Sequence, residues 1–591
     1  MKANDINRPT ISEATSRNWK RLHSNGSGRL MSRANKQLST KTVVPVEYFS
    51  NKDNIADIQR FVSFCKEQDY SVEEVIFSVG MRLLKEAGII DKPHVAAALR
   101  ALTPLMPLTP LRQPPLTPLT SLPTDESDLL GLLYQCFMAE GEKNRKGSYY
   151  TPLEVARNMT KNLDFTKGQT FFDPCCGSGA FLLALEGARP SQIFGCDNDP
   201  IAVMIAKINL LLKFPNKVFD PQIVCCDYLN ATKALKAINA LKANYIISNP
   251  PWGAVIYDKF CNPISTKESF SFFFEKAFQQ LENDGIIRFL LPESILNVKC
   301  HRYFRRFLLE HGDLQSITRY PGAFSGVQTK YIDIAVKRAD GDNRHFERSE
   351  KSSAKEGLKR VLVEDFSTPL RSARNDVSLQ CFFLTKNLNF NLLSDSDLEK
   401  VQMILAKGKY TLKDSIWGLG IVTGDNKKHL KFKHGKGTEP IYTGKEIEAY
   451  KLKSPKHFIK YKRSEYQQVA NDSIYRAEEK LVYKFISKNL VFAYDDSKSL
   501  FLNSANILIP RIPGMSIKTV LAFLNSELFK FLYKSLFGEI KILKGNLMEL
   551  PFPEISPETD IKLTKLVDKV LKGNKEAVQL IDAEINSIFG L

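Results

Sequence analysis

The chain has 591 residues, which is too many for one hydrophobic core, so we expect several domains. It carries 83 Lys and Arg against 65 Asp and Glu, a formal charge of +18. This excess favours a polyanionic partner such as nucleic acid, with an inert basic surface as the alternative. No apolar run spans a membrane, no signal peptide begins the chain, and ten cysteines without Cys-x-x-Cys indicate neither zinc nor disulfides. We expect a cytoplasmic protein without a membrane partner.

The first 125 residues predict helices and a linker. Residues 1–45 are polar and basic, and they contain either a short helix-turn-helix or a frayed tail. Residues 52–101 repeat apolar side chains at helical spacing. Between 102 and 123, "LTPLMPLTPLRQPPLTPLTSLP" places seven prolines at near-regular spacing, which excludes helix and central strand. We therefore predict a basic helical region over 1–101 and an extended linker over 102–125.

From residue 126 onward, short apolar segments alternate with helical ones. Such alternation predicts a doubly wound, mainly parallel α/β sheet of seven strands, with helices on both faces. The predicted strands are 169–174, 192–197, 222–227, 244–250, 285–291, 314–320 and 331–338. The predicted helices between them include 179–186, 200–212 and 270–281. Ligands of such sheets bind at the carboxyl ends of the strands.

Two regions follow the last of these strands. Residues 338–379 are charged and aperiodic, and they predict a flexible surface insertion within an α/β domain of residues 126–389. Residues 390–591 predict a separate α+β domain that ends in a helical segment at 557–591. Between 427 and 463, twelve Lys and Arg face three Glu, with aromatic residues interleaved. This pattern is typical of a phosphate-contacting, base-reading surface, or of a solvated face with core aromatics.

The carboxyl ends of the first three strands carry polar residues suited to a nucleoside ligand. The first strand leads into "DPCCGSGAF", where Gly177 and Gly179 permit a tight turn before a helix. Asp197 ends the second strand, where a carboxylate could hold two ribose hydroxyls. Asp227 and Tyr228 end the third strand, where an acceptor and a ring could contact adenine. A helix cap explains any one Asp, but not three at successive strand ends.

The loop after the first strand disfavours a dinucleotide. The third glycine of Gly-x-Gly-x-x-Gly is replaced by Leu182, and Asp173 at the loop's start would repel a diphosphate. A carboxylate suits a ligand with a positive amino group. S-adenosylmethionine (AdoMet) has an ammonium, a sulfonium, a ribose and an adenine, so we predict it as the cofactor.

The fourth strand ends in "NPPW", residues 249–252. An exocyclic amine on a base becomes a better methyl acceptor when two oxygens bond its N–H groups. Asn249 supplies a side-chain oxygen, and Pro250 supplies a carbonyl whose direction the ring of Pro251 fixes. Trp252 offers a face for an extruded base. Cytosine C5 chemistry would need a cysteine here, whereas the loop cysteines predict packing residues. A turn capped by a packed Trp is the alternative reading.

At this point the sequence resembles the amino-group DNA methyltransferases of bacterial restriction–modification systems, of the N6-adenine-specific type. The matching segments, in order, are "GSYYTP", "DPCCGSGAFL", "GCDNDP", "CDYL", "NPPWG", "FSFFFEKAFQQL", "GIIRFLLPESIL" and "FSGVQTKYIDIAV". The subgroup places the cofactor half before the catalytic motif and a target-recognition domain at the C-terminal end. Trp252 departs slightly, since Tyr or Phe is commoner there.

The resemblance also implies roles for individual residues. Thr151 and Pro152 would border the methionine part of the cofactor, and Tyr150 beside them joins the cofactor set. Asp173, Gly177 and Gly179 would line the loop, Asp197 would bind ribose, and Asp227 would bind the cofactor's adenine. A second ring near "GAFSGVQT" would hold the flipped base. Phe324 is the candidate for this second ring. The equal alternative is that Phe324 is a core packing residue.

These observations predict methyl transfer from AdoMet to N6 of a flipped adenine at a specific double-stranded DNA sequence, as the modification part of a restriction–modification system. No Asp-…-Glu-x-Lys cluster precedes residue 126, so we predict no nuclease in this chain, no metal site, and a separate endonuclease as a possible partner. An RNA or protein-glutamine methyltransferase stays open, because both use Asn-Pro-Pro-aromatic. A decayed DNA-binding protein is a further alternative, while a basic scaffold leaves the strand-end carboxylates unexplained.

Overall fold

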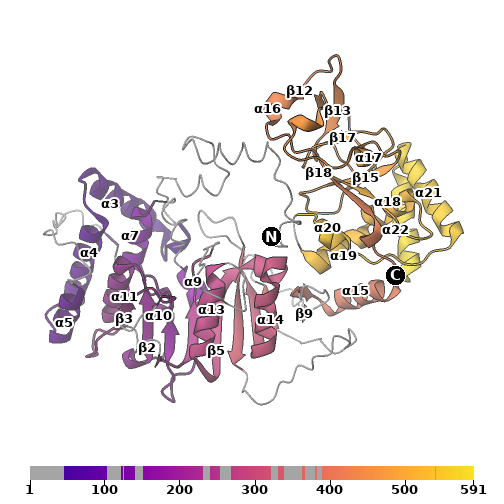
Figure 1. The fold of residues 1–591 in the computed structure, drawn as a ribbon. Coiled ribbons are helices and arrows are strands. Elements are labelled where there is room, and N and C mark those ends of the chain that lie inside the picture. The colour runs from indigo at the N-terminus through magenta and orange to yellow at the C-terminus, as the bar shows by residue number, and fades with distance from the viewer. Residues whose placement is uncertain are drawn as a thin grey trace, which may run out of the picture. The chain divides into compact units, whose positions relative to one another are not determined.

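The computed structural model contains two compact units, divided between Cys381 and Phe382, whose elements are labelled in Figure 1. The structure describes residues 46–102, 122–123, 126–139, 151–230, 240–252, 268–320, 330–338, 362–365, 380–382, 389–538 and 541–591. We call the unit before the division the catalytic unit and the other the C-terminal unit. The predicted domain limits at residues 101, 125 and 389 stay predictions.

The N-terminal part of the catalytic unit is helical, as the periodicity predicts. Its helices are α3 (Ile55–Glu67), α4 (Val72–Glu86), α5 (Pro93–Leu102) and α7 (Leu129–Phe137), after the short 3-10 turns Val46–Tyr48 and Lys52–Asn54. A reciprocal cap starts α4, since Ser71 Oγ accepts from Glu74 N at 3.2 Å and Glu74 Oε2 accepts from Ser71 N at 2.8 Å. Apolar residues of these helices share one core with Met204, Ile205, Ile208 and Leu211 of α11 (Pro200–Lys213).

An eight-stranded sheet forms the centre of the catalytic unit, in the order β3-β2-β1-β4-β5-β7-β6-β8. The strands are β1 (Phe171–Asp173), β2 (Ile193–Asp197), β3 (Gln222–Cys225), β4 (Ala243–Ser248), β5 (Leu281–Pro292), β6 (Gly312–Arg319), β7 (Tyr331–Arg338) and β8 (Leu362–Asp365). The first five strands in this order, from β3 to β5, are parallel to one another. In contrast, β7 runs antiparallel to both β5 and β6. The predicted mainly parallel fold is confirmed.

The sheet has one strand more than the seven that we predicted. The extra strand, β8, pairs in parallel with β6 and comes from the segment interpreted as a flexible insertion. Its segment, Leu362–Asp365, has only four residues and is closely flanked by charged residues, so its sequence pattern does not predict a strand. Residues 339–361 and 366–379 of that segment lie outside the described residues.

Helices cover both faces of the sheet, so the strands are apolar on both sides. On one face, α9 (Leu153–Thr160), α10 (Ala180–Ala184) and α11 share a core with residues of β1 to β5. On the other, Phe274 of α13 (Ser269–Gln280) packs on β5, with its ring 5.2 Å from that of Phe289, and Phe304 of α14 (Arg302–His311) packs on Phe274 at 5.2 Å. Short 3-10 turns at Pro190–Gln192, Glu293–Leu296 and Lys299–His301 complete this unit.

The C-terminal unit combines two four-stranded sheets with a helical layer, and β10 pairs with β9 in a separate two-stranded sheet. One sheet has the order β11-β18-β15-β16 and the other β12-β14-β13-β17. Its strands are β9 (Gln380–Phe382) at the division, β10 (Asn391–Leu393), β11 (Ile416–Leu419), β12 (Leu430–Lys431), β13 (Glu439–Tyr442), β14 (His457–Ile459), β15 (Lys480–Lys484), β16 (Phe492–Asp495), β17 (Leu500–Phe501) and β18 (Ala505–Ile509). The result is the α+β fold that we predicted for this half.

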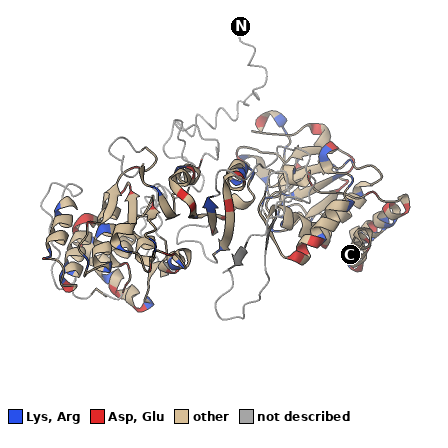
Figure 2. Cartoon of the chain, turned by 90° about the horizontal axis from the view of Figure 1, so that it is seen from below, with Lys and Arg blue, Asp and Glu red and all other residues tan. Residues whose placement is uncertain are grey.

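The C-terminal unit contains eight helices among its described residues, and six of them share a core with the sheet β11-β18-β15-β16. The eight are α15 (Asp395–Lys407), α16 (Asn426–His429), α17 (Asp472–Tyr475), α18 (Ile517–Asn525), α19 (Glu527–Phe537), α20 (Lys544–Leu547), α21 (Pro557–Leu571) and α22 (Glu576–Phe589), with 3-10 turns at Leu412–Asp414 and Arg463–Glu465. The last two confirm the predicted terminal helical segment. Lys, Arg, Asp and Glu are spread over the helices of both units in Figure 2, while apolar side chains fill the cores.

Candidate active site

The carboxyl end of β1 carries a buried carboxylate. Asp173 is fully buried, and its Oδ1 accepts hydrogen bonds from Ser248 Oγ at 2.6 Å and from the backbone N of Cys175 at 3.1 Å. Its other oxygen, Oδ2, has no hydrogen-bond partner among the described residues. Buried polar atoms are almost always bonded, so an orphaned carboxylate oxygen indicates a place for a ligand's donor.

Burial sets the protonation of this group. It raises the pKa of Asp173 to about 7, and the bonds from Ser248 and Cys175 only partly oppose the shift. An ammonium at Oδ2 would favour the ionised form and lower this pKa again. The residue therefore fits the amino group of AdoMet better than it fits a phosphate.

The glycine loop after Asp173 joins the ends of β1 and β2. Gly177 and Gly179 have φ of 53° and 92°, a region that only glycine enters without strain. The backbone N of Gly177 donates to Asp197 Oδ2 at 2.9 Å, and Asp197 Oδ1 accepts from Asp199 N at 2.9 Å. Burial raises the pKa of Asp197 as well. The structure thus brings the predicted glycine loop together with Asp197, the residue predicted to bind ribose.

The two residues predicted to contact adenine separate at the end of β3. Asp227 is exposed, and its Oδ1 accepts from Leu229 N at 3.0 Å, so the carboxylate caps its own turn. Tyr228 is buried, with its ring stacked 5.6 Å from Phe273 and beneath Lys276 Nζ at 4.4 Å. These contacts give the Tyr228 ring a packing role, and its contact with the cofactor's adenine stays a prediction.

The asparagine predicted to be catalytic lies next to the predicted methionine-binding residues. Asn249 follows β4, and its Nδ2 donates to Thr151 Oγ1 at 3.3 Å. Thr151 is buried, and Pro152 after it caps α9, where its carbonyl accepts from Ala156 N at 3.0 Å. Because the amide nitrogen is turned toward Thr151, the carbonyl oxygen of Asn249 points to its other side. The structure therefore brings Thr151, Pro152 and Asn249 together.

The two prolines and the tryptophan are held by neighbouring elements. Pro250 is buried, and the carbonyl of Pro251 accepts from Ser269 Oγ at the start of α13. Trp252 Nε1 donates to the carbonyl of Leu290 on β5 at 3.1 Å, and its ring lies 6.2 Å from that of Tyr331 on β7. Trp252 stays partly exposed, so one part of the indole is fixed while another part faces outward.

Sequence reasoning missed Ser248, which connects the two halves of the site. It is fully buried at the end of β4, directly before Asn249. Its hydroxyl donates to Asp173 and lies 3.0 Å from Cys175 Sγ. A single hydroxyl in an apolar strand was the available signal, because buried polar groups require a partner.

A second missed feature is a buried ion pair behind the site. Arg288 of β5 binds Asp333 of β7 through two hydrogen bonds of 2.6 and 2.8 Å. Its NH1 donates to the carbonyl of Met159 in α9 at 3.0 Å, and Tyr320 OH donates to Asp333 Oδ2 at 3.0 Å. The pair ties the helix that follows Pro152 to the strands beside Trp252.

The loop cysteines have no features of a nucleophile. Burial raises the pKa of both Cys175 and Cys176, so both stay thiols at neutral pH. Cys176 is buried in the core, as predicted, whereas Cys175 is only partly buried and has its Sγ 3.0 Å from Ser248 Oγ. Among the described residues, no group of three His, Cys, Asp or Glu could hold a metal ion. Tyr150 and Phe324 lie outside the described residues, so their roles stay predictions.

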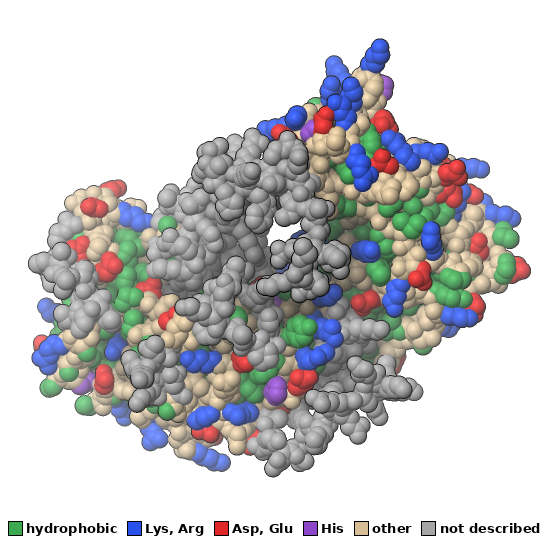
Figure 3. Space-filling view, viewed as in Figure 1, with side chains coloured by type: hydrophobic (Ala, Val, Ile, Leu, Met, Phe, Trp, Pro, Cys, Tyr) green, Lys and Arg blue, Asp and Glu red, His purple; other side chains and the backbone are tan. Residues whose placement is uncertain are grey.

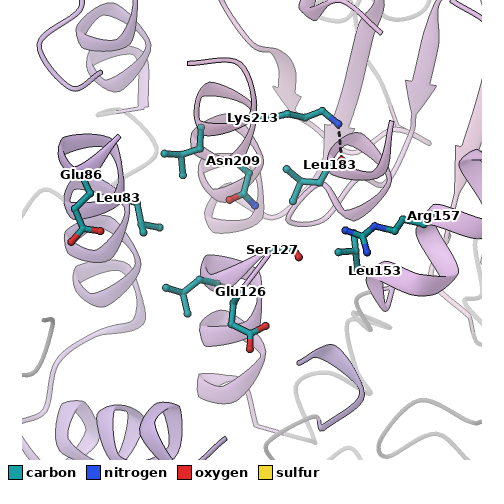
Figure 4. A pocket seen from close by; sticks show the side chains of 11 residues that line it. Leu83, Glu86, Glu126, Ser127, Leu153, Arg157, Leu183, Asn209 and Lys213 are labelled. Atoms are coloured by element: carbon teal, nitrogen blue, oxygen red, sulfur yellow. Dashed lines mark hydrogen bonds between the residues drawn. The ribbon is translucent and has the colours of Figure 1, made fainter. Parts of the chain in front are cut away.

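A cavity of about 480 Å³ lies elsewhere in the catalytic unit, between the N-terminal helices and the helices on one sheet face (Figure 4). Leu83, Glu126, Arg157, Asn209 and Lys213 are among its lining residues. Two of the charged groups are already bonded: Lys213 Nζ donates to the carbonyl of Leu183 at 2.6 Å, and Glu126 accepts from Ser50 N at 2.7 Å. No predicted site residue lines this cavity.

Known families match both halves of the chain. Residues 125–332 match the N-6 DNA methylase family, and residues 439–552 match the TaqI-like C-terminal specificity domain. The first range contains every predicted catalytic and cofactor residue. The chain therefore carries an N-6 DNA methylase domain followed by a specificity domain, which confirms the predicted family and the order of its parts.

Curated relatives agree with this assignment. The type II methyltransferase M.VspI of Vibrio sp. (strain 343) is 29% identical, over 53% of this chain and 74% of that protein. The methylase subunit of the type I restriction enzyme EcoEI of Escherichia coli is 25% identical, over 35% of this chain and 46% of that protein. The chain is thus a homologue of restriction–modification methyltransferases, and it is a DNA methyltransferase, the modification component of such a system.

A solved structure shares the fold of nearly the whole chain. The type IIL restriction-modification enzyme MmeI, solved in complex with DNA, aligns with a TM-score of 0.60 and 13% identity, over 91% of this chain and 96% of that one. At this identity the likeness shows a common fold. Among the residues that the structure describes, no helix is long and apolar enough to cross a membrane.

Proposed function

We propose that this chain transfers a methyl group from AdoMet to N6 of adenine at a specific sequence of double-stranded DNA. The observation that carries the proposal is the junction at the end of β4. Ser248 bonds the buried carboxylate of Asp173, and the next residue, Asn249, bonds Thr151. A carboxylate for the cofactor's ammonium, at the end of β1, and an amide for the target amine, directly after β4, are thus joined through Ser248 at the ends of two neighbouring parallel strands.

The residues of the loop fit AdoMet. The orphaned Oδ2 of Asp173 would accept a hydrogen bond from its ammonium, and Gly177 and Gly179 allow close approach to the backbone. Asp197 would accept from the ribose hydroxyls. When bound, the cofactor supplies a methyl group made electrophilic by its sulfonium. The role of the protein is to hold that methyl group in place and to exclude water from it.

Asn249 and Pro250 would act on the target amine. The side-chain oxygen of Asn249 and the carbonyl of Pro250 would each accept one N–H of the adenine amine, which favours a tetrahedral nitrogen with an available lone pair. The bond from Asn249 Nδ2 to Thr151 keeps the amide oriented before the substrate arrives. Preorganised acceptors of this kind stabilise developing charge without covalent catalysis.

Trp252 would support the extruded base. Its indole N–H is bonded to Leu290, so the ring is held in place while its accessible part can stack on adenine. Phe324 remains our candidate for a second ring. The C-terminal unit would read the flanking sequence, and a separate endonuclease would cut DNA that lacks the mark. Such a role places the protein in the bacterial cytoplasm.

Label transfer from tritiated AdoMet tests this function against its alternatives. The purified chain is offered plasmid DNA, bulk RNA and a cell protein extract, and labelled DNA is digested to nucleosides. We expect label in DNA alone, and in N6-methyldeoxyadenosine among its nucleosides. Label in RNA or in protein glutamine would show that the substrate is RNA or protein and not DNA. Binding of DNA without label in any substrate would favour the decayed alternative.

A further inference from the structure

A projecting loop of the C-terminal unit has features that the methyl-transfer proposal does not use. β12 and β13 both pair antiparallel with β14, one on each side, so residues 432–438 must cross from one side of β14 to the other. Figure 3 shows Lys and Arg side chains gathered on the projection where Figure 1 places β12 and β13. We call residues 432–438 the crossing loop.

One aromatic ring stands out on this loop. Phe432 is 81% exposed, and it is the only exposed phenylalanine among the residues that the structure describes. Its ring lies 5.2 Å from that of His457, and the neighbouring His434 ring lies 5.4 Å from Phe458. The aromatic groups therefore form a small exposed cluster, in which Phe432 is presented to solvent and packs on no core.

The charges around Phe432 are positive and uncompensated. Lys431, Lys433, Lys436, Lys456 and Lys460 are exposed, and none forms an ion pair with a carboxylate of the described residues. Elsewhere in this unit, lysines such as Lys518 and Lys562 are paired with Asp568 and Glu584. A ring surrounded by unpaired ammonium groups suits a partner that is both polyanionic and able to stack.

We propose that the crossing loop enters a groove of the DNA duplex, where its lysines contact phosphates and Phe432 presses as a wedge against a base step. Apolar side chains that enter a groove in this way partly unstack the bases and bend the duplex, while phosphate contacts fix the register. This inference rests on the proposed function and adds a named contact to it. A protein partner would need no such excess of unpaired lysine, and a membrane would require more than one exposed ring.

The two kinds of contact predict different responses to salt. Loss of one phosphate-contacting lysine reduces the salt slope of log affinity by about 1, because fewer counterions are released. Loss of the stacking ring leaves that slope unchanged and lowers affinity at every salt concentration, by about 10- to 100-fold. Because Phe432 is exposed, its truncation does not open a core.

The test measures binding of the full chain to a plasmid-derived duplex that the wild-type chain methylates, across a salt series. We expect Phe432→Ala to weaken binding with an unchanged slope, Lys436→Ala to lower the slope, and Phe432→Trp to retain affinity and to show fluorescence quenching on DNA. Val218→Ala, at an 85% exposed apolar residue of the catalytic unit, is the matched control and should bind as wild type does.

Equal affinity of Phe432→Ala and wild type, or loss of affinity in Val218→Ala as well, would overturn the inference. Failure of the proposed function is distinguishable from this result. If wild type methylates no duplex, a random-sequence duplex replaces the probe, and the response of Phe432→Ala on it still decides whether the ring contacts DNA.

Discussion

The catalytic unit and the crossing loop use charge in opposite ways. Around the β4 end, carboxylates such as Asp173 and Asp333 are fully buried and receive several hydrogen bonds each. On the crossing loop, lysines are exposed and unpaired. Buried charges act over short distances and fix geometry, whereas exposed charges attract a polyanion and are screened by salt. Chemistry and recognition should therefore respond differently to the same kind of mutation.

The largest effect should come from breaking the buried ion pair. Arg288→Ala leaves the Asp333 carboxylate without its main partner in the interior, which should cost about 3–5 kcal/mol of unfolding free energy. Calorimetry of the full chain should show a lower transition temperature for the catalytic unit. The matched control is Arg463→Ala, whose partner Asp472 is exposed and can be solvated by water, so no resolvable shift is expected. Equal shifts in the two variants would contradict the contrast between buried and exposed charge.

The next effect concerns catalysis without loss of structure. Asn249→Ala removes one of the two acceptors for the target amine, and the maximal rate of methyl transfer should fall by about 10²–10³-fold. Affinity for AdoMet, measured by calorimetric titration, should change little, since the loop of Asp173 remains. Asn216→Ala, in the exposed turn between α11 and β3, serves as the control and should transfer methyl at the wild-type rate. Normal transfer by Asn249→Ala would exclude this residue from the site.

A smaller effect follows from the pKa of about 7 at Asp173. Below that pH the carboxyl is protonated and must release its proton to pair with an ammonium. AdoMet affinity should therefore fall as the pH drops below 7, approaching tenfold per unit. Titrations from about pH 5.5 to 7 suit the test, because the cofactor's own α-amino group stays charged there.

Two substitutions isolate the contribution of Asp173. Asp173→Asn should bind AdoMet more weakly and lose this pH dependence. The control Asp164→Asn, in the exposed turn before β1, should retain it. A pH profile in Asp173→Asn that matches wild type would show that another group carries the proton.

Much of the catalytic unit could be predicted because its information is local. Apolar runs marked β1 to β7, and Gly177, Gly179 and Asp197 stand at strand ends where the structure brings them together. β8 was missed because four residues between charged segments carry no periodic signal. The remaining differences depend on tertiary packing.

The sequence could not reveal which side chains meet across strands. The Arg288–Asp333 pair depends on the antiparallel register of β5 and β7, in which Arg288 faces Ala335 and Asp333 faces Leu290. Tyr228 follows a strand end, and only the packing of α13 shows that its ring turns into the core beside Phe273. A turn can direct such a residue to either side of the sheet, and periodicity does not decide between them.

The central claim is that the residues at the β4 end direct a methyl group to adenine N6 in DNA. Sequencing that detects modified bases, applied to DNA from cells expressing the chain, tests it most directly. We predict N6-methyladenine at one recurring sequence with wild type, and at none with Asn249→Ala. Unmodified adenines with both, or the same modified sites with both, would contradict the account.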